Sequence, residues 1–241
     1  AIHFAHEIAH KVVADSNGMN ITFPTLIPSF LTGITGSVTA LAAPPKDKQA
    51  LLDFAIVGPL AGMIVSLLSL YLGITITAST GAEAYANLPA LSLQVLRQSS
   101  LAGGLMEAVI PGLLNVPDAA GATKALSEVF IPLHPLAIAG FFGLLVNAVN
   151  LLPLGRTDGG RVGLALFGRT GLQVAGFFTS AALLIQGLYG SDLLLFFFSF
   201  VVLFQGEMEI PQRNEVDDVD FSRVLLATAA GCLVLLTLIP M

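Results

Sequence analysis

The sequence predicts an α-helical polytopic membrane protein with about six transmembrane helices and a short extended or re-entrant segment near residues 20–43. Of its 241 residues, 55% are hydrophobic and only 11% are charged, whereas soluble domains carry about 25% charged residues. This fraction of charged residues is too small to cover the surface of a globular protein in water. Lipid must therefore be a large part of the solvent around the chain. The net charge of −6 disfavours a nucleic-acid partner, which would require a basic face.

The first quarter of the chain is predicted to contain a partial helix followed by extended backbone. Residues 1–14 are interpreted as an N-terminally truncated first helix, because a charged motif begins at position 6 and a spanning helix needs about 20 apolar residues. Residues 15–52 are rich in Thr and Ile and contain Pro24, Pro28, Pro44 and Pro45. That composition opposes a helix and favours extended or re-entrant backbone.

The rest of the chain supplies the spanning helices of what we expect to be one intramembrane domain over 1–241. The apolar runs are roughly 53–78, 130–152, 171–189, 192–205 and 222–240. The run 192–205 is short, so a tight helical hairpin with 171–189 is expected. Residues 79–129 are expected to be a loop with amphipathic or re-entrant helices, in which 101–114 does not span. Residues 206–221, called the acidic segment below, must face water.

Basic residues are distributed unequally between the two sides of this six-span arrangement. One side holds the loops 15–52, 151–170 and 206–221. It collects eight basic residues: Lys11, Lys46, Lys48, Arg156, Arg161, Arg169, Arg213 and Arg223. The other side receives only Arg97 and Lys124. Since cytoplasmic loops carry the excess of Lys and Arg, the first side is predicted to be cytoplasmic or stromal.

The most specific pattern is HEIAH, in which His6, Glu7 and His10 stand as H-E-x-x-H. Positions i and i+4 of a helix share a face, so both imidazoles can bind one metal ion. Glu7 is adjacent to that face and can take a proton from a water at the metal. Ionisable residues in an apolar helix are costly and usually functional. The pattern therefore predicts a metal centre and not a chance match.

A catalytic zinc ion needs a third protein ligand beside an open position. The histidine candidates are His3 and His134, of which His134 is better explained as an interfacial residue. The carboxylate candidate is Asp158 in NLLPLGRTDGG, where Pro153 and the glycines break the helix near the membrane edge. An Asp-Gly pair is also a common turn. Beside the histidine motif, we favour Asp158 as the ligand.

Together, HEIAH and NLLPLGRTDGGR resemble the motifs of the site-2 protease family of intramembrane zinc metalloproteases. GPLAG at 58–62 looks like the glycine-proline helix element of this family. The stretches FPTLIPSFLTGITG and HPLAIAGFFGLLVNAVNLLPLGRTDGG, with the acidic segment, are closest to its plastid branch, the ethylene-dependent gravitropism-deficient and yellow-green proteins and their cyanobacterial relatives. Thr157 stands where family members commonly carry Leu. The resemblance covers nearly the whole chain. It implies one zinc ion held by His6, His10 and Asp158, Glu7 as the catalytic base, and endopeptidase cleavage in or near transmembrane segments of protein substrates.

Several polar and small residues are secondary candidates. Asn147 and Asn150 are three residues apart on one helix face and could bind a substrate carbonyl or an oxyanion. Helix–helix hydrogen bonding is the alternative. Gly58 and Gly62 have the small-xxx-small spacing of close helix packing. Residues 20–43 could pair with an extended substrate strand.

Two other functions fit a polytopic chain with ionisable residues. A membrane transporter could use intramembrane charges as an ion path, but this does not explain the H-E-x-x-H spacing. A pseudoprotease scaffold would usually lack a ligand or the Glu, and all four groups are present. The expected location is a plastid membrane, thylakoid or envelope, or a cyanobacterial membrane, with the active site toward the stromal or cytoplasmic side and the lipid bilayer around it.

Overall fold

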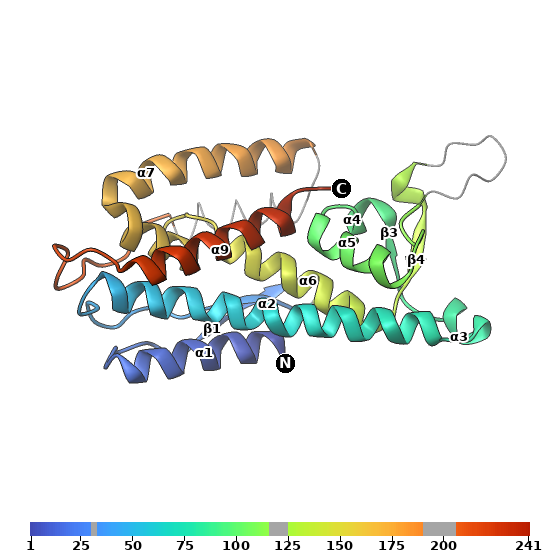
Figure 1. Ribbon diagram of the computed structural model, residues 1–241, viewed down its shortest axis with the longest axis horizontal. Helices are drawn as coiled ribbons and strands as arrows, with labels where there is room; N and C mark the ends of the chain where they lie inside the picture. Colours follow the sequence, from blue (N-terminus) through green and yellow to red (C-terminus); the bar gives the residue numbers. More distant parts are fainter. Residues whose placement is uncertain (30–32, 116–124, 190–205) are drawn as a thin grey trace. The chain divides into compact units, whose positions relative to one another are not determined.

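The computed structural model describes residues 1–29, 33–115, 125–189 and 206–241, and most of them are helical (Figure 1). The longer helices are α1 (Ile2–Ser16), α2 (Lys48–Ser79), α6 (Pro135–Asn150), α7 (Asp158–Tyr189) and α9 (Phe221–Leu238). Within the described ranges, three helices are long and apolar enough to cross a bilayer, namely α2, α7 and α9. The prediction of a mostly helical chain is confirmed, the three helices are candidates for the predicted spans, and the count of six spans stays a prediction.

Helix boundaries differ from the predicted ones around α6 and α7. The predicted spans 53–78 and 222–240 correspond to α2 and α9. The predicted 130–152 narrows to the 16 residues of α6. Residues 158–170 were expected in a loop, which is wrong, because α7 already begins at Asp158. The helix changes direction at Gly168, whose φ of 66° lies in the left-handed region that glycine tolerates (Figure 1). The predicted span 192–205 lies outside the described residues.

The predicted extended segment is an antiparallel hairpin of β1 (Thr25–Ser29) and β2 (Gly33–Val38). Its register pairs Thr25 with Val38. The pairing continues beyond the strands, because the Thr22 N–H donates to the Ala40 carbonyl at 2.9 Å and the Ala42 N–H donates to the Asn20 carbonyl at 2.8 Å. Extended backbone within 20–43 is therefore confirmed, and its re-entrant position in the bilayer stays a prediction.

The described part of residues 79–129 contains short helices, as expected, and one strand that was not predicted. The helices are α3 (Ala82–Ala86), α4 (Leu93–Leu96), α5 (Ser100–Val109) and the 3-10 turn η1 (Leu126–Glu128). At 1.5 Å per residue, α5 is about 15 Å long, half of a bilayer core, so it does not span. The strand β3 (Ala90–Ser92) pairs antiparallel with β4 (Phe130–Pro132). Three-residue strands leave no usable alternation in the sequence.

The chain divides into two compact units, and the predicted site residues on α1 and α7 belong to the first. The first unit contains residues 3–62 and 146–232, and the second contains 63–145 and 233–241. The first has a buried core that includes Leu51, Phe54 and Leu164. Phe177 and Phe178 on α7 are 69% and 66% exposed, which fits a helix that faces lipid. The expectation of one domain over 1–241 stays a prediction.

In the second unit, α2 packs closely on α6. A methyl group at Gly73 would overlap the backbone of Ala137, and one at Gly140 would overlap the backbone of Leu70. This approach depends on glycine, as in other membrane helix pairs. The backbone N–H of His134 donates to the Thr77 hydroxyl at 2.9 Å just before α6 begins. This hydrogen bond ties the start of α6 to α2.

In the first unit, the acidic segment lies against the chain that leads into α2. The N–H groups of Arg213 and Asn214 donate to the carbonyls of Pro45 and Lys46 at 2.9 and 3.0 Å. The segment ends where Asp220 caps α9 by accepting the Arg223 N–H at 2.9 Å. This hydrogen bond lowers the pKa of the Asp220 carboxyl below its usual range, and a weaker contribution in the same direction comes from the Ser222 hydroxyl, which also donates to it.

Candidate metal centre

Helix α1 brings both motif histidines onto its buried face. The buried residues of α1 are His6, His10 and Ala14, spaced four apart, and the two histidines are 3% and 2% exposed. The helix ends in a Schellman motif, in which the Met19 N–H donates to the Ala14 carbonyl at 2.8 Å and Gly18 has φ 62°. The prediction that both imidazoles share one face is confirmed.

Asp158 is the first residue of α7 and is aimed by a tight loop. The Thr157 hydroxyl accepts the Gly160 N–H at 3.1 Å, which is the geometry of a helix N-cap. A methyl group at Gly159 would overlap the carbonyl of Leu151, so the preceding loop folds directly onto the helix start. Asp158 is 8% exposed as a result. Thr157 thus has a capping role that its departure from the family pattern did not reveal.

The two imidazoles and the carboxylate meet at one point. His6 Nε2 and His10 Nε2 are 3.0 Å apart, and Asp158 Oδ2 is 3.4 Å from the first and 3.3 Å from the second. Zinc bonds of about 2.0–2.2 Å in tetrahedral geometry separate ligand atoms by roughly 3.4 Å. The three distances therefore match three corners of a zinc tetrahedron. Within the described ranges, this is the only such group of three metal-ligand side chains.

Hydrogen bonds on the far side of each ring assign its lone pair to this point. His10 Nδ1 is 2.8 Å from the Phe54 carbonyl oxygen, which can only accept, so Nδ1 carries the proton. His6 Nδ1 donates to Asn147 Oδ1 at 2.8 Å. Both Nε2 atoms then present lone pairs toward a carboxylate oxygen. Three acceptors that face one another at these distances repel, a cation between them relieves the repulsion, and nitrogen and oxygen donors suit zinc.

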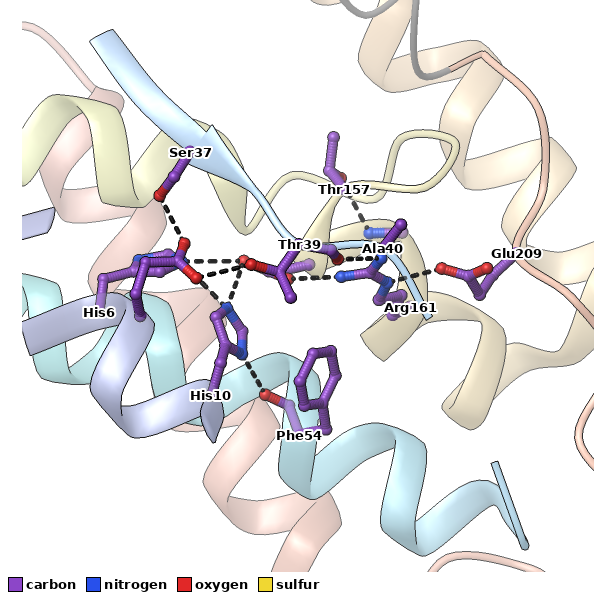
Figure 2. A network of polar contacts seen from close by, with 12 residues as sticks. His6, His10, Ser37, Thr39, Ala40, Phe54, Thr157, Arg161 and Glu209 are labelled. Carbon is purple, nitrogen blue, oxygen red and sulfur yellow. Dashed lines mark hydrogen bonds and ion pairs between the residues drawn. The ribbon is translucent and has the colours of Figure 1, made fainter. Parts of the chain in front are cut away.

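Glu7 is held beside the metal centre by the end of the hairpin. The Ser37 hydroxyl donates to Glu7 Oε1 at 2.5 Å and the Thr39 hydroxyl donates to Oε2 at 2.6 Å. Figure 2 shows Ser37 and Thr39 in the same network of polar contacts as His6 and His10. Both carboxylate oxygens are therefore oriented by one short stretch of chain, and Glu7 is positioned for work as a general base.

The remaining predicted site residues lie in different environments. Asn147 is 1% exposed, and its amide oxygen is on His6, so it orients an imidazole. Asn150 is the half-buried last residue of α6. For both asparagines, a contact with substrate or an oxyanion stays a prediction. His134 accepts the Leu136 N–H at 3.3 Å in the second unit, which is a local contact.

Gly58 and Gly62 leave room for the site residues on the face of α2. A methyl group at Gly58 would overlap the imidazole of His10, and one at Gly62 would overlap the amide of Asn147. The predicted close packing is confirmed for these positions, since each glycine admits a polar side chain of the metal centre. An added methyl group must displace that side chain or the helix.

Gly58→Ala is expected to lower zinc affinity by about 10-fold or more, because His10 must move off the metal point. Competition with a chelator in detergent solution measures the change. Gly231→Ala in α9 is the control, since a methyl group there meets open space. Equal zinc affinity of the two variants would mean that α2 shifts to accommodate the methyl group and that His10 keeps its position.

Four polar residues of the centre were not identified from the sequence. These are Ser37 and Thr39, which hold Glu7, and Arg161 and Glu209, which form a buried ion pair at 2.8 Å. Arg161 follows Asp158 by one turn in TDGGR, and a charged residue beside an apolar helix is a usable signal. Nothing in the local sequence links Glu209 to it.

Comparison with known proteins supplies the family. The model of peptidase family M50 matches residues 1–187. Similar proteins are the "Probable zinc metalloprotease EGY1, chloroplastic" of Oryza sativa subsp. japonica, 32% identical over 100% of this chain and 39% of its own length, and the "Probable zinc metallopeptidase EGY3, chloroplastic" of Arabidopsis thaliana, 32% identical over 97% of this chain and 40% of its own.

The Arabidopsis thaliana "Probable zinc metalloprotease EGY2, chloroplastic" is 28% identical over 98% of this chain and 39% of its own length. The chain thus spans about two fifths of these curated relatives. No solved structure matches. A family model that covers residues 1–187, together with full-chain similarity to proteins named as zinc metalloproteases, agrees with the geometry of the site: the chain belongs to peptidase family M50, the site-2 protease family.

Proposed function

We propose that this chain is the core of an intramembrane zinc metalloendopeptidase that hydrolyses peptide bonds in or near transmembrane segments. The observation that carries the proposal is the convergence of three lone pairs, from His6, His10 and Asp158, at one point. The carboxylate of Glu7 lies beside that point, on the same helix as the two histidines. When bound there, zinc supplies a Lewis acid that polarises a carbonyl and lowers the pKa of water at its open position.

The roles proposed for the protein groups follow from their contacts. His6, His10 and Asp158 hold the metal. Glu7 takes the proton of the attacking water and passes it to the leaving amine. The hydroxyls of Ser37 and Thr39 keep the Glu7 carboxylate oriented through both steps, because each bonds one oxygen. Asn150 is proposed to contact the substrate carbonyl or the oxyanion.

The proposed substrates are transmembrane proteins, unwound locally so that a carbonyl can reach the metal. Residues 20–43 are proposed to pair with the unwound strand, since β1 and β2 are extended and strand addition is a common mode of peptide recognition. We propose six spans and a stromal or cytoplasmic position of the site, supported by the bias of basic residues. The chloroplastic relatives support a plastid membrane, with a cyanobacterial membrane as the counterpart in bacteria.

Metal analysis combined with cleavage tests this function. Detergent-purified protein is expected to contain about one zinc ion per chain and to cleave a transmembrane peptide in liposomes. Removal of zinc by a chelator should abolish cleavage, and addition of zinc should restore it. Cleavage that persists in metal-free protein would overturn the proposal. Metal binding without any peptide cleavage would favour a pseudoprotease scaffold.

A further inference from the structure

Arg161 is a buried cation with three acceptors around it. Its Nη1 donates to Asp158 Oδ1 at 3.2 Å, its Nη2 to the Thr39 carbonyl at 2.8 Å, and its Nε to Glu209 Oε2 at 2.8 Å. Figure 2 shows Arg161 between Thr39 and Glu209, next to Phe54. Arg161 and Glu209 are 3% and 5% exposed. A buried charge requires such pairing, because the desolvation cost is otherwise large.

The first contact decides how Asp158 presents itself to the metal. Arg161 holds Oδ1, and Oδ2 is the oxygen near both histidines. A hydrogen bond of this kind on Oδ1 occupies one of its lone pairs and favours metal binding through Oδ2 alone. One-oxygen ligation leaves the fourth position of a zinc tetrahedron open, as a catalytic site requires.

The second contact links the metal ligand to the base. The Thr39 carbonyl accepts from Arg161, and the Thr39 hydroxyl donates to Glu7 at 2.6 Å. The position of Thr39, and with it one oxygen of Glu7, therefore depends on the guanidinium. The planar fork of Arg can hold three acceptors at fixed angles, which an ammonium cannot do.

The third contact balances charge beside the metal. A guanidinium next to a metal ligand disfavours a bound cation, and the carboxylate of Glu209 offsets that charge. Glu209 belongs to the acidic segment, whose exposed neighbour Glu207 makes an ion pair with Arg156. Only the Glu209 pair is buried and touches a group that itself bonds Asp158.

We propose that Arg161 and Glu209 form a positioning pair of the metal centre, in which the acidic segment fixes the one-oxygen presentation of Asp158 and the placement of Thr39 against Glu7. The inference rests on the proposed function, since it assigns roles around the same metal. The proposal gives Glu209, which lies outside both the HEIAH and the NLLPLGRTDGGR motifs, a role in the metal centre.

Metal binding and cobalt spectra test the pair without relying on cleavage. In the full chain, Glu209→Gln and Arg161→Lys are expected to lower zinc affinity by about 10- to 100-fold. Their Co²⁺ complexes should have shifted absorption bands, because Asp158 can then use both oxygens. The matched control is Glu207→Gln, a loss of an exposed pair in the same segment, expected to change zinc affinity by less than about 2-fold.

The double variant Arg161→Met with Glu209→Leu separates positioning from folding. Replacing a buried ion pair by apolar groups is commonly tolerated, so the thermal midpoint should stay near wild type while zinc affinity and the Co²⁺ spectrum change. Wild-type affinity and spectrum in this variant, or single variants equal to Glu207→Gln, would overturn the positioning role. Failure of the proposed function differs, since wild-type protein would then bind no zinc, cleave without zinc, or bind zinc without cleaving.

Discussion

Glu7→Gln is expected to keep its zinc and to lose peptide cleavage by a factor of about 10²–10⁴. The amide has nearly the same shape and can still bond the hydroxyls of Ser37 and Thr39, because a hydroxyl both donates and accepts. It cannot accept a proton from the attacking water. The metal ligands are untouched, so zinc content and thermal stability should match the wild-type protein while turnover falls.

Asp15→Asn is the matched control for Glu7→Gln. It removes a carboxylate from the same helix, where Asp15 is paired with Lys11 on the exposed side at 2.5 Å. This variant should cleave at the wild-type rate, because exposed pairs on a helix contribute little. Near wild-type turnover of Glu7→Gln would remove Glu7 from the mechanism. Loss of zinc in that variant would mean that the carboxylate helps to hold the metal.

Asp158→Ala is expected to reduce zinc affinity by more than the roughly 10- to 100-fold typical of an outer contact, because one of three ligand atoms disappears. The two histidines remain, held by Asn147 and by the Phe54 carbonyl, so weak binding should persist. Arg161 keeps Glu209 as a partner, which limits the damage to the fold. Zinc titration and the thermal midpoint measure the two effects separately.

Asp53→Asn is the control for Asp158→Ala, since it removes a carboxylate from another ion pair of the same unit. Asp53 binds Arg223 through two contacts of 2.7 Å. It should lower stability and leave the zinc affinity of the folded protein unchanged. Full zinc affinity in Asp158→Ala would exclude Asp158 as a ligand and require another third group.

The sequence predicts those parts of the metal centre that depend on the spacing of residues close together in the chain. His6 and His10 share a face because four residues make about one helical turn. Asp158 is recognisable as a single carboxylate in a Pro- and Gly-broken apolar stretch. Residues 20–43 are predicted as extended by their prolines and β-branched residues, and the structure pairs Ile21 with Leu41 in a bridge near the two ends of this segment.

Composition and local periodicity by themselves determined that the chain is a helical membrane protein with an H-E-x-x-H metal motif, since both depend on neighbours in sequence. Only the tertiary structure decided that α7 starts at Asp158, because its start depends on the Thr157 cap and on a loop folded onto glycine. The same holds for Thr39, Arg161 and Glu209, whose contacts join residues 48 and 122 positions apart. A buried charge selects its partners by desolvation and distance in space, and no local pattern records that choice.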